Sequence, residues 1–130
     1  MRLLDVFEDE SQLCLVTELM RGGDLFKQLS KASTFSEAEA ARLARQIVSA
    51  VAHLHTHGVV HCDLKPSNIL VAENDAESHR EAMTVKIADF GLSQSLGGSA
   101  GRKLTEVCGT PDYYAPEPVS YTHLTLPTKA

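Results

Sequence analysis

One long helix of this 130-residue chain can be predicted from its local residues alone, and its length limits the folds that the chain can adopt. Ser36 and Glu39 form a capping box, in which the serine accepts from the first-turn backbone and the glutamate reaches back. Apolar residues then recur at steps of four, four and three, which places them on one helical face; they are Leu43, Ile47, Val51 and Leu54. Because Gly58 is typical of a helix C-terminus, the pattern predicts a helix that ends near His57.

Short strands are predicted around this helix. Leu3–Phe7 and Gln12–Leu19 are rich in Val and Leu and are separated by the turn-like residues EDES, which predicts a hairpin. Asp24 then starts a short helix. Three further apolar pieces read as brief strands, namely Val59–Val60, Ile69–Val71 and Val85–Ile87. The stretches AENDAESHREAMT and SQSLGGSAGRKLTE are expected to be an exposed loop and a mobile loop. The predicted class is therefore α+β.

Composition excludes several kinds of protein. The net charge of −5 argues against nucleic-acid binding, which needs clustered Lys and Arg. Apolar runs stay short of the roughly 18–20 residues that cross a bilayer. The acidic N-terminus MRLLDVFEDE is unlike a secretory signal. The three cysteines are scattered and odd in number, so we expect free thiols and a reduced, cytoplasmic compartment.

The stretch AHLHTHGVVHCDLKPSN contains four histidines, which raises the question of a metal site. His53 and His57 are four residues apart and share a helical face, whereas His55 points elsewhere. The spacing is neither HExxH nor that of a CxxC zinc site. A histidine-based metal-binding module therefore stays open only as an alternative, to be tested by zinc retention.

Three motifs lie in order along the chain. HCDLKPSN at 61–68 resembles the catalytic loop of eukaryotic protein kinases, DFG stands at 89–91, and GTPDYYAPE at 109–117 resembles the end of their activation segment. The chain thus resembles Ser/Thr kinases of the calcium/calmodulin-dependent or cyclic-nucleotide-dependent groups. The resemblance implies a partial kinase-like α+β fold, with the end of the N-lobe sheet, the hinge and the first half of a mainly helical C-lobe. It also implies transfer of the γ-phosphate of ATP to a protein hydroxyl, with Mg²⁺.

The residue types suit that chemistry, which depends on positioning and charge neutralisation. By the resemblance, Asp63 accepts or orients the proton of the substrate hydroxyl, and Lys65 pairs with the transferred phosphoryl group. Asn68 and Asp89 supply the hard oxygen atoms that Mg²⁺ prefers. His61 is expected to be structural, in a core stack with Phe90, and Gly91 to allow a backbone excursion after Asp89. The plainer reading of Asp63 and Asp89 is as ordinary turn or capping aspartates.

LVTELMRGGDLF resembles the hinge between the two kinase lobes. The resemblance makes Thr17 the gatekeeper and lets the backbone of Glu18 and Met20 hydrogen-bond adenine. It places Asp24 near the ribose or a basic substrate residue, and Leu70 beneath the base. The plainer alternative is an edge strand followed by a helix cap.

The sequence departs from the family pattern at several positions. Cys62 replaces the arginine that pairs with a phosphorylated activation-loop residue, and a neutral thiol cannot form that pair. Glu106 stands where relatives carry the phosphorylated threonine, with Thr105 beside it, which predicts activity independent of activation-loop phosphorylation. Cys108 is expected to be a small buried hydrophobe, or alternatively a redox-sensitive thiol. Cys62 also keeps a pseudokinase scaffold open as the alternative function.

The resemblance covers residues 1–118. VSYTHLTLPT, by contrast, resembles a translated sequencing-library adapter, so residues 119–130 are expected to be non-native. The phosphate loop and its partner lysine are expected before Met1, and further helices after the chain. The 130 residues alone are therefore expected to be marginally folded and inactive. Expected partners are ATP and a protein substrate, and the resemblance allows a calcium-sensing regulator.

Overall fold

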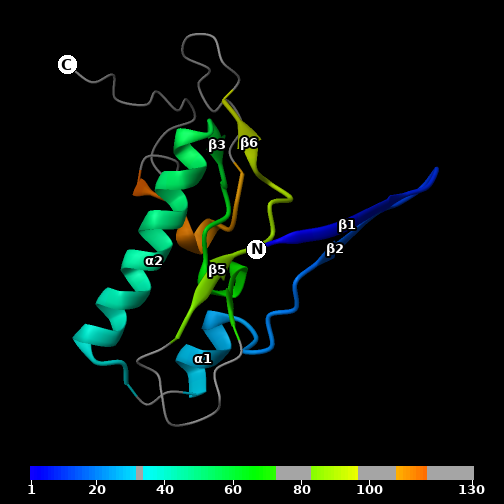
Figure 1. Cartoon of the computed structure of the whole chain (residues 1–130). Coiled ribbons are helices and arrows are strands. Elements are labelled where there is room, and N and C mark those ends of the chain that lie inside the picture. The colour runs from blue at the N-terminus through cyan, green and yellow to red at the C-terminus, as the bar shows by residue number, and fades with distance from the viewer. Residues whose placement is uncertain (32–33, 73–82, 97–107, 117–130) are drawn as a thin grey trace.

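The computed structural model describes residues 1–31, 34–72, 83–96 and 108–116. Figure 1 shows one long helix beside several short strands and turns. In chain order the elements are β1 (Leu3–Glu8), β2 (Leu13–Thr17), α1 (Leu25–Lys31), α2 (Glu37–Thr56), β3 (Val59–Val60), the 3-10 turn η1 (Pro66–Asn68), β4 (Ile69–Val71), β5 (Val85–Ile87), β6 (Gln94–Ser95) and the 3-10 turn η3 (Pro111–Tyr113).

Helix α2 begins and ends where the sequence predicts. The Ser36 amide donates to Glu39 Oε2 at 2.8 Å, and the Glu39 amide donates to Ser36 Oγ at 3.2 Å, so both halves of the capping box form. At the other end His57 caps the helix and Gly58 takes a left-handed φ of 68°, which favours glycine. The local residues are thus enough to define this helix.

The strands form three antiparallel pairs, β1–β2, β3–β6 and β4–β5. In the β4–β5 pair Leu70 lies opposite Lys86, and Val71 lies opposite Val85. Figure 1 shows the β1–β2 hairpin projecting from the rest of the molecule, and its large apolar side chains are exposed. The predicted EDES turn is closed by Asp9, whose Oδ1 accepts from the amides of Ser11 and Gln12.

A small core joins α1, α2, β4 and the start of β5. Its buried members are Leu25, Leu43, Ile69, Val71 and Met83, with Phe35, Ile47 and Val85 packed against them. The predicted apolar face of α2 therefore points toward this core, although its last two members, Val51 and Leu54, are only half-buried. Burial of these residues fixes β4 and β5 against the two helices, and β4 directly follows η1.

Two predictions about loops were wrong in part. Met83 lies in the stretch that was expected to be an exposed loop, yet its side chain is only 8% exposed, within the core. Gln94 and Ser95 lie in the stretch that was expected to be a mobile loop, yet they pair with Val60 and Val59. Most of both stretches, and all of residues 119–130, lie outside the described residues, so the adapter-derived tail stays a prediction. No helix in the described part of the chain is long and apolar enough to cross a membrane.

Candidate active site

The carboxylate of Asp63 is the centre of a hydrogen-bonded cluster, which we call the Asp63 cluster and which consists of Asp63, Lys65, Asn68 and Thr110. Lys65 Nζ lies 2.8 Å from Asp63 Oδ2, and Asn68 Nδ2 donates to the same oxygen at 3.0 Å. Thr110 Oγ1 donates to Asp63 Oδ1 at 2.7 Å. Three side chains therefore hold one buried carboxylate in a single orientation.

Thr110 also accepts from Lys65 Nζ at 2.6 Å, so it contacts both predicted catalytic residues. Thr110 was not among the residues predicted from the sequence. The only available signal was its place in the GTPDYYAPE motif, and 45 positions separate it from Lys65. Its hydroxyl shows that Asp63 Oδ1 is placed to accept from an alcohol.

The Asp63 cluster lowers the pKa of Asp63 from 3.8 to about 2. The largest cause is the hydrogen bond from Lys65, followed by the one from Thr110, and burial opposes them. Because donors to the charged form favour ionisation, Asp63 is a carboxylate at neutral pH. It can therefore accept a hydrogen bond from a hydroxyl group, as the predicted role requires.

His61 fixes the backbone on which this carboxylate stands. Its ring is 2% exposed, and it donates from Nε2 to the Ala88 carbonyl at 2.9 Å and accepts at Nδ1 from the Asp63 amide at 3.3 Å. His61 thus links the segment that carries Asp63 to Ala88, the residue directly before Asp89. Its burial agrees with the structural role expected for it. Its ring also contacts Phe90 edge-on, with centroids 4.9 Å apart. Phe90, however, is 40% exposed, so the expected core stack was wrong for that residue.

Asn68 and Asp89 are brought to neighbouring positions at one end of the β4–β5 pair. The Ala88 amide donates to the Asn68 carbonyl at 2.9 Å, so Asp89 is the next residue after this contact. Asn68 uses its Nδ2 toward Asp63, both to the carbonyl and to the carboxylate, while its Oδ1 is of the oxygen type that Mg²⁺ prefers. An amide oxygen and a carboxylate at one edge fit a magnesium ion shared with phosphates.

The backbone after β5 differs from the expectation at one residue. Asp89 itself, and not Gly91, takes the left-handed conformation, with a φ of 61°. Asp89 is one of the residue types that tolerate this region, because its short polar side chain can bond locally. Here Asp89 Oδ1 accepts from the Gly91 amide at 3.3 Å. Non-glycine residues in this region are concentrated at functional sites.

The predicted hinge residue Glu18 makes an ion pair with β5. Lys86 Nζ lies 2.8 Å from Glu18 Oε1 and 2.9 Å from Glu18 Oε2, and this hydrogen bond is the largest cause that lowers the pKa of Glu18. The Glu18 amide donates to the Arg2 carbonyl. The Glu18 side chain thus links the end of β2 to the β4–β5 pair through Lys86, a residue that was not predicted from the sequence.

Asp24 and Leu70 are neighbours through a β-bridge that joins the hinge segment to β4. The Asp24 carboxylate caps α1, since Oδ1 accepts from the Lys27 amide at 2.8 Å and Oδ2 lies 2.9 Å from Lys27 Nζ. This is the plainer alternative, a helix cap, and a contact of Asp24 with ribose stays a prediction. Met20 is half-buried in the connection that follows β2.

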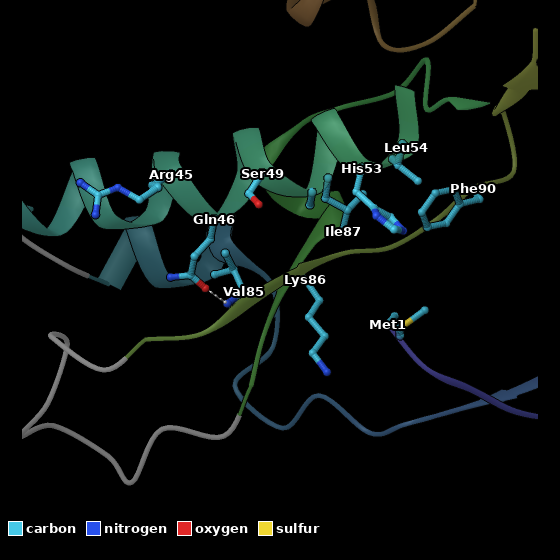
Figure 2. A pocket seen from close by; sticks show the side chains of 11 residues that line it. Met1, Arg45, Gln46, Ser49, His53, Leu54, Val85, Lys86, Ile87 and Phe90 are labelled. Atoms are coloured by element: carbon cyan, nitrogen blue, oxygen red, sulfur yellow. Dashed lines mark hydrogen bonds between the residues drawn. The ribbon is translucent and has the colours of Figure 1, made fainter. Parts of the chain in front are cut away.

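A pocket of about 680 Å³ lies between α2 and β5 (Figure 2). Gln46 lies at its edge and bridges the two elements, because Nε2 donates to the Met83 carbonyl at 2.9 Å and Oε1 accepts from the Val85 amide at 3.0 Å. The amine of Lys86 points away from α2 in Figure 2, toward its partner Glu18. Among the described residues that line the pocket, none belongs to the Asp63 cluster. The pocket is therefore separate from the predicted catalytic groups.

The histidine pair singled out in the sequence lies at the C-terminal end of α2. His53 and His57 contact each other with ring centroids 4.3 Å apart, and His57 Nδ1 lies 2.8 Å from the His53 carbonyl. In the described parts of the chain, no group of three or more His, Cys, Asp or Glu side chains could hold a metal ion. The two rings therefore have a local explanation at the end of a helix.

Comparison with known proteins gives the family. The model of the protein kinase domain matches residues 1–129, so the chain belongs to the protein kinase family. A "Probable myosin light chain kinase" of Dictyostelium discoideum is 48% identical over 116 residues, which are 89% of this chain and 28% of that protein. A calcium/calmodulin-dependent protein kinase of Emericella nidulans is 46% identical over 88% of this chain and 27% of the relative. The phosphorylase b kinase gamma catalytic chain, liver/testis isoform, of Mus musculus is 44% identical over 88% of this chain and 26% of the relative.

These matches confirm the predicted fold class, a partial kinase-like α+β arrangement. The chain spans between a quarter and a third of the length of these relatives.

Proposed function

We propose that this chain supplies the catalytic loop and hinge of a protein serine/threonine kinase, which transfers the γ-phosphate of ATP to a protein hydroxyl. The observation that carries the proposal is the Asp63 cluster, in which one ionised carboxylate, one ammonium, one amide and one hydroxyl are hydrogen-bonded together. Lysine two residues after the catalytic aspartate is the form typical of Ser/Thr kinases. The relatives are named as kinases of this kind, which supports the assignment.

Each member of the Asp63 cluster has a separate role. Asp63 accepts a hydrogen bond from the substrate hydroxyl, and this bond orients the hydroxyl oxygen toward the phosphorus. The Asp63 carboxylate later takes the hydroxyl proton. Lys65 stands beside that carboxylate and balances the charge that develops on the transferred group. Thr110 holds both in register, since it donates to one and accepts from the other. Because none of these roles requires a covalent intermediate with the protein, positioning is the main contribution.

Asn68 and Asp89 are the proposed ligands of Mg²⁺, which neutralises phosphate charge when it is bound with ATP. Their support is the backbone contact that places the two residues at one end of the β4–β5 pair. Asn68 also donates to Asp63, so the proposed metal ligand and the proposed base are mechanically connected. A shift of one would move the other.

The proposed adenine site is formed by the hinge. The Glu18 amide is already used by the ladder with Arg2, so its carbonyl is the group left for the base, together with the backbone of Met20. Leu70 is bridged to Asp24 and is half-buried, which suits an apolar surface beneath a flat ring. The ion pair between Glu18 and Lys86 supports the position of this strand end.

The proposed partners are ATP and a protein substrate. A relative that is named a calcium/calmodulin-dependent protein kinase supports calmodulin as a regulator of the whole protein. A cytoplasmic location is proposed on the free thiols of Cys14, Cys62 and Cys108. The alternative from another class is a pseudokinase scaffold, which would bind partners without phosphoryl transfer.

The test uses the whole protein that contains this chain, with Asp63→Asn as the variant. The rate of phosphate transfer to a peptide should fall about 10²–10⁴-fold, the range for loss of a general base, while Mg²⁺-dependent ATP binding is kept. Asp112→Asn is the matched control, because Asp112 is an exposed aspartate in η3. Transfer at the unaltered rate in Asp63→Asn would refute the assignment of the base. A wild-type protein that binds its partners but transfers no phosphate would support the scaffold instead.

A further inference from the structure

Cys62 and Cys108 meet where the catalytic loop touches the segment at residues 108–116. The Cys62 carbonyl faces Gly109, where an added Cβ would lie only 2.4 Å from that oxygen. Gly109 has a φ of 108°, a conformation available to glycine, and this lets the two backbones approach closely. Cys108 directly precedes that contact, so the approach of Gly109 brings its neighbour to the same place.

A third element, β6, contacts this pair of cysteines through Gln94. Its backbone pairs with Val60 in the β3–β6 ladder, and its Nε2 donates to Cys108 Sγ at 3.4 Å. The Cys62 thiol points back toward the same ladder and donates to the Val60 carbonyl at 3.6 Å. Val60 therefore contacts the Cys62 thiol and Gln94 contacts the Cys108 thiol, and these two residues are paired in the β3–β6 ladder.

The thiols are neighbours electrostatically as well. Burial is the largest cause that raises the pKa of Cys62 to about 11, and the adjacent Cys108 thiol is the next. Cys62 is therefore protonated at neutral pH. Both Cys62 and Cys108 are half-buried. Cys14, in contrast, is exposed on β2, opposite Phe7 in the projecting hairpin.

We propose that Cys62 and Cys108 form a reversible intramolecular disulfide when the protein meets a hydroperoxide. The Cys108 thiol gives up its proton as its sulfur attacks the peroxide oxygen and becomes a sulfenic acid, and the peroxide O–O bond breaks so that the departing oxygen takes up that proton and leaves as water or an alcohol. The Cys62 sulfur then attacks the sulfenic sulfur, its proton leaves with the departing hydroxyl as a second water, and the S–S bond forms. The two thiols together lose two electrons, which reduce the peroxide.

Such a bond would join the catalytic loop covalently to the segment that carries Thr110. Cys62 directly precedes Asp63, and Cys108 stands two residues before Thr110. The cross-link would therefore act on the two ends of the Thr110–Asp63 hydrogen bond. A dithiol reductant would reverse it.

The spacing of the three cysteines gives a built-in reference for the experiment. Cys62 lies 48 positions from Cys14 and 46 positions from Cys108. Closure entropy depends on the logarithm of loop length, so an unfolded chain forms these two pairs almost equally. A preference for one pair in native buffer therefore reports the folded arrangement.

The experiment oxidises the whole protein that contains this chain with hydrogen peroxide, once in native buffer and once in guanidinium chloride. Remaining thiols are alkylated, the protein is digested, and linked peptides are quantified by mass spectrometry. We expect the Cys62–Cys108 pair to exceed the Cys14–Cys62 pair about tenfold or more in native buffer, and the two to be similar in denaturant. Dithiothreitol should abolish both.

Cys14→Ser is the matched control and should leave the native cross-link unchanged, whereas Cys62→Ser should remove it. If Cys62→Ser fails to fold, the comparison of native and denatured wild-type chains still decides. Equal yields of the two pairs in native buffer, or separate over-oxidation of Cys62 and Cys108 without a cross-link, would overturn the proposal.

Discussion

The Thr110 hydroxyl, which hydrogen-bonds to both Asp63 and Lys65, can be tested by a single substitution. Thr110→Val keeps the shape of the side chain and removes the hydroxyl that donates to Asp63 at 2.7 Å and accepts from Lys65 at 2.6 Å. Hydrogen bonds to charged groups contribute about 1.5–3 kcal/mol each. Lys65 and Asn68 still contact the carboxylate in the variant, so a part of this energy is recovered.

We therefore expect a loss of about 1.4–2.8 kcal/mol of transition-state stabilisation, which is roughly a 10- to 100-fold fall in kcat/KM. The assay is steady-state phosphate transfer to a peptide by the whole protein, with ATP saturating. Thr110→Ser is the matched control because it retains the hydroxyl, and its kcat/KM should stay within about threefold of wild type, since only a methyl group is lost. A Thr110→Val protein that is folded and as active as Thr110→Ser would refute the reasoning.

Two further predictions concern stability. Gln46→Leu leaves the Met83 carbonyl and the Val85 amide without their shared partner and should lower the free energy of unfolding by about 1–3 kcal/mol. Urea denaturation would measure this, with exposed Arg45→Leu on the same helix as the control; equal effects would contradict the bridging role. The lowered pKa of Asp63 means that its contribution to stability is full above pH 3.8 and is lost as pH falls through about 2. Unfolding measured across this range should therefore be steeper in pH for wild type than for Asp63→Asn, and identical slopes would contradict the assigned pKa.

The elements that the sequence predicted well are those whose causes are local. The start of α2 depends on Ser36 and Glu39, which are three residues apart, and its end depends on Gly58. The turn of the first hairpin depends on Asp9 and its next neighbours. Such signals act within a few residues along the chain, so they can be read without knowledge of the fold.

The parts that sequence reasoning missed depend on partners far apart in the chain. Thr110 and Asp63 are separated by 47 positions, and Lys86 and Glu18 by 68. Met83 lies in a polar, charged stretch, and only the packing of β5 against the core makes it buried. The motifs indicated which residues carry chemistry, while the contacts between them required the folded arrangement.

The central claim is that Asn68 and Asp89 meet one metal–nucleotide complex beside Asp63. The most direct measurement is calorimetric binding of ATP to the whole protein, with and without Mg²⁺, for wild type, Asn68→Ala and Asp89→Asn. We expect Mg²⁺ to strengthen ATP binding to wild type, and each substitution to remove most of this gain while the metal-free affinity stays the same. An undiminished effect of Mg²⁺ in both variants would contradict it.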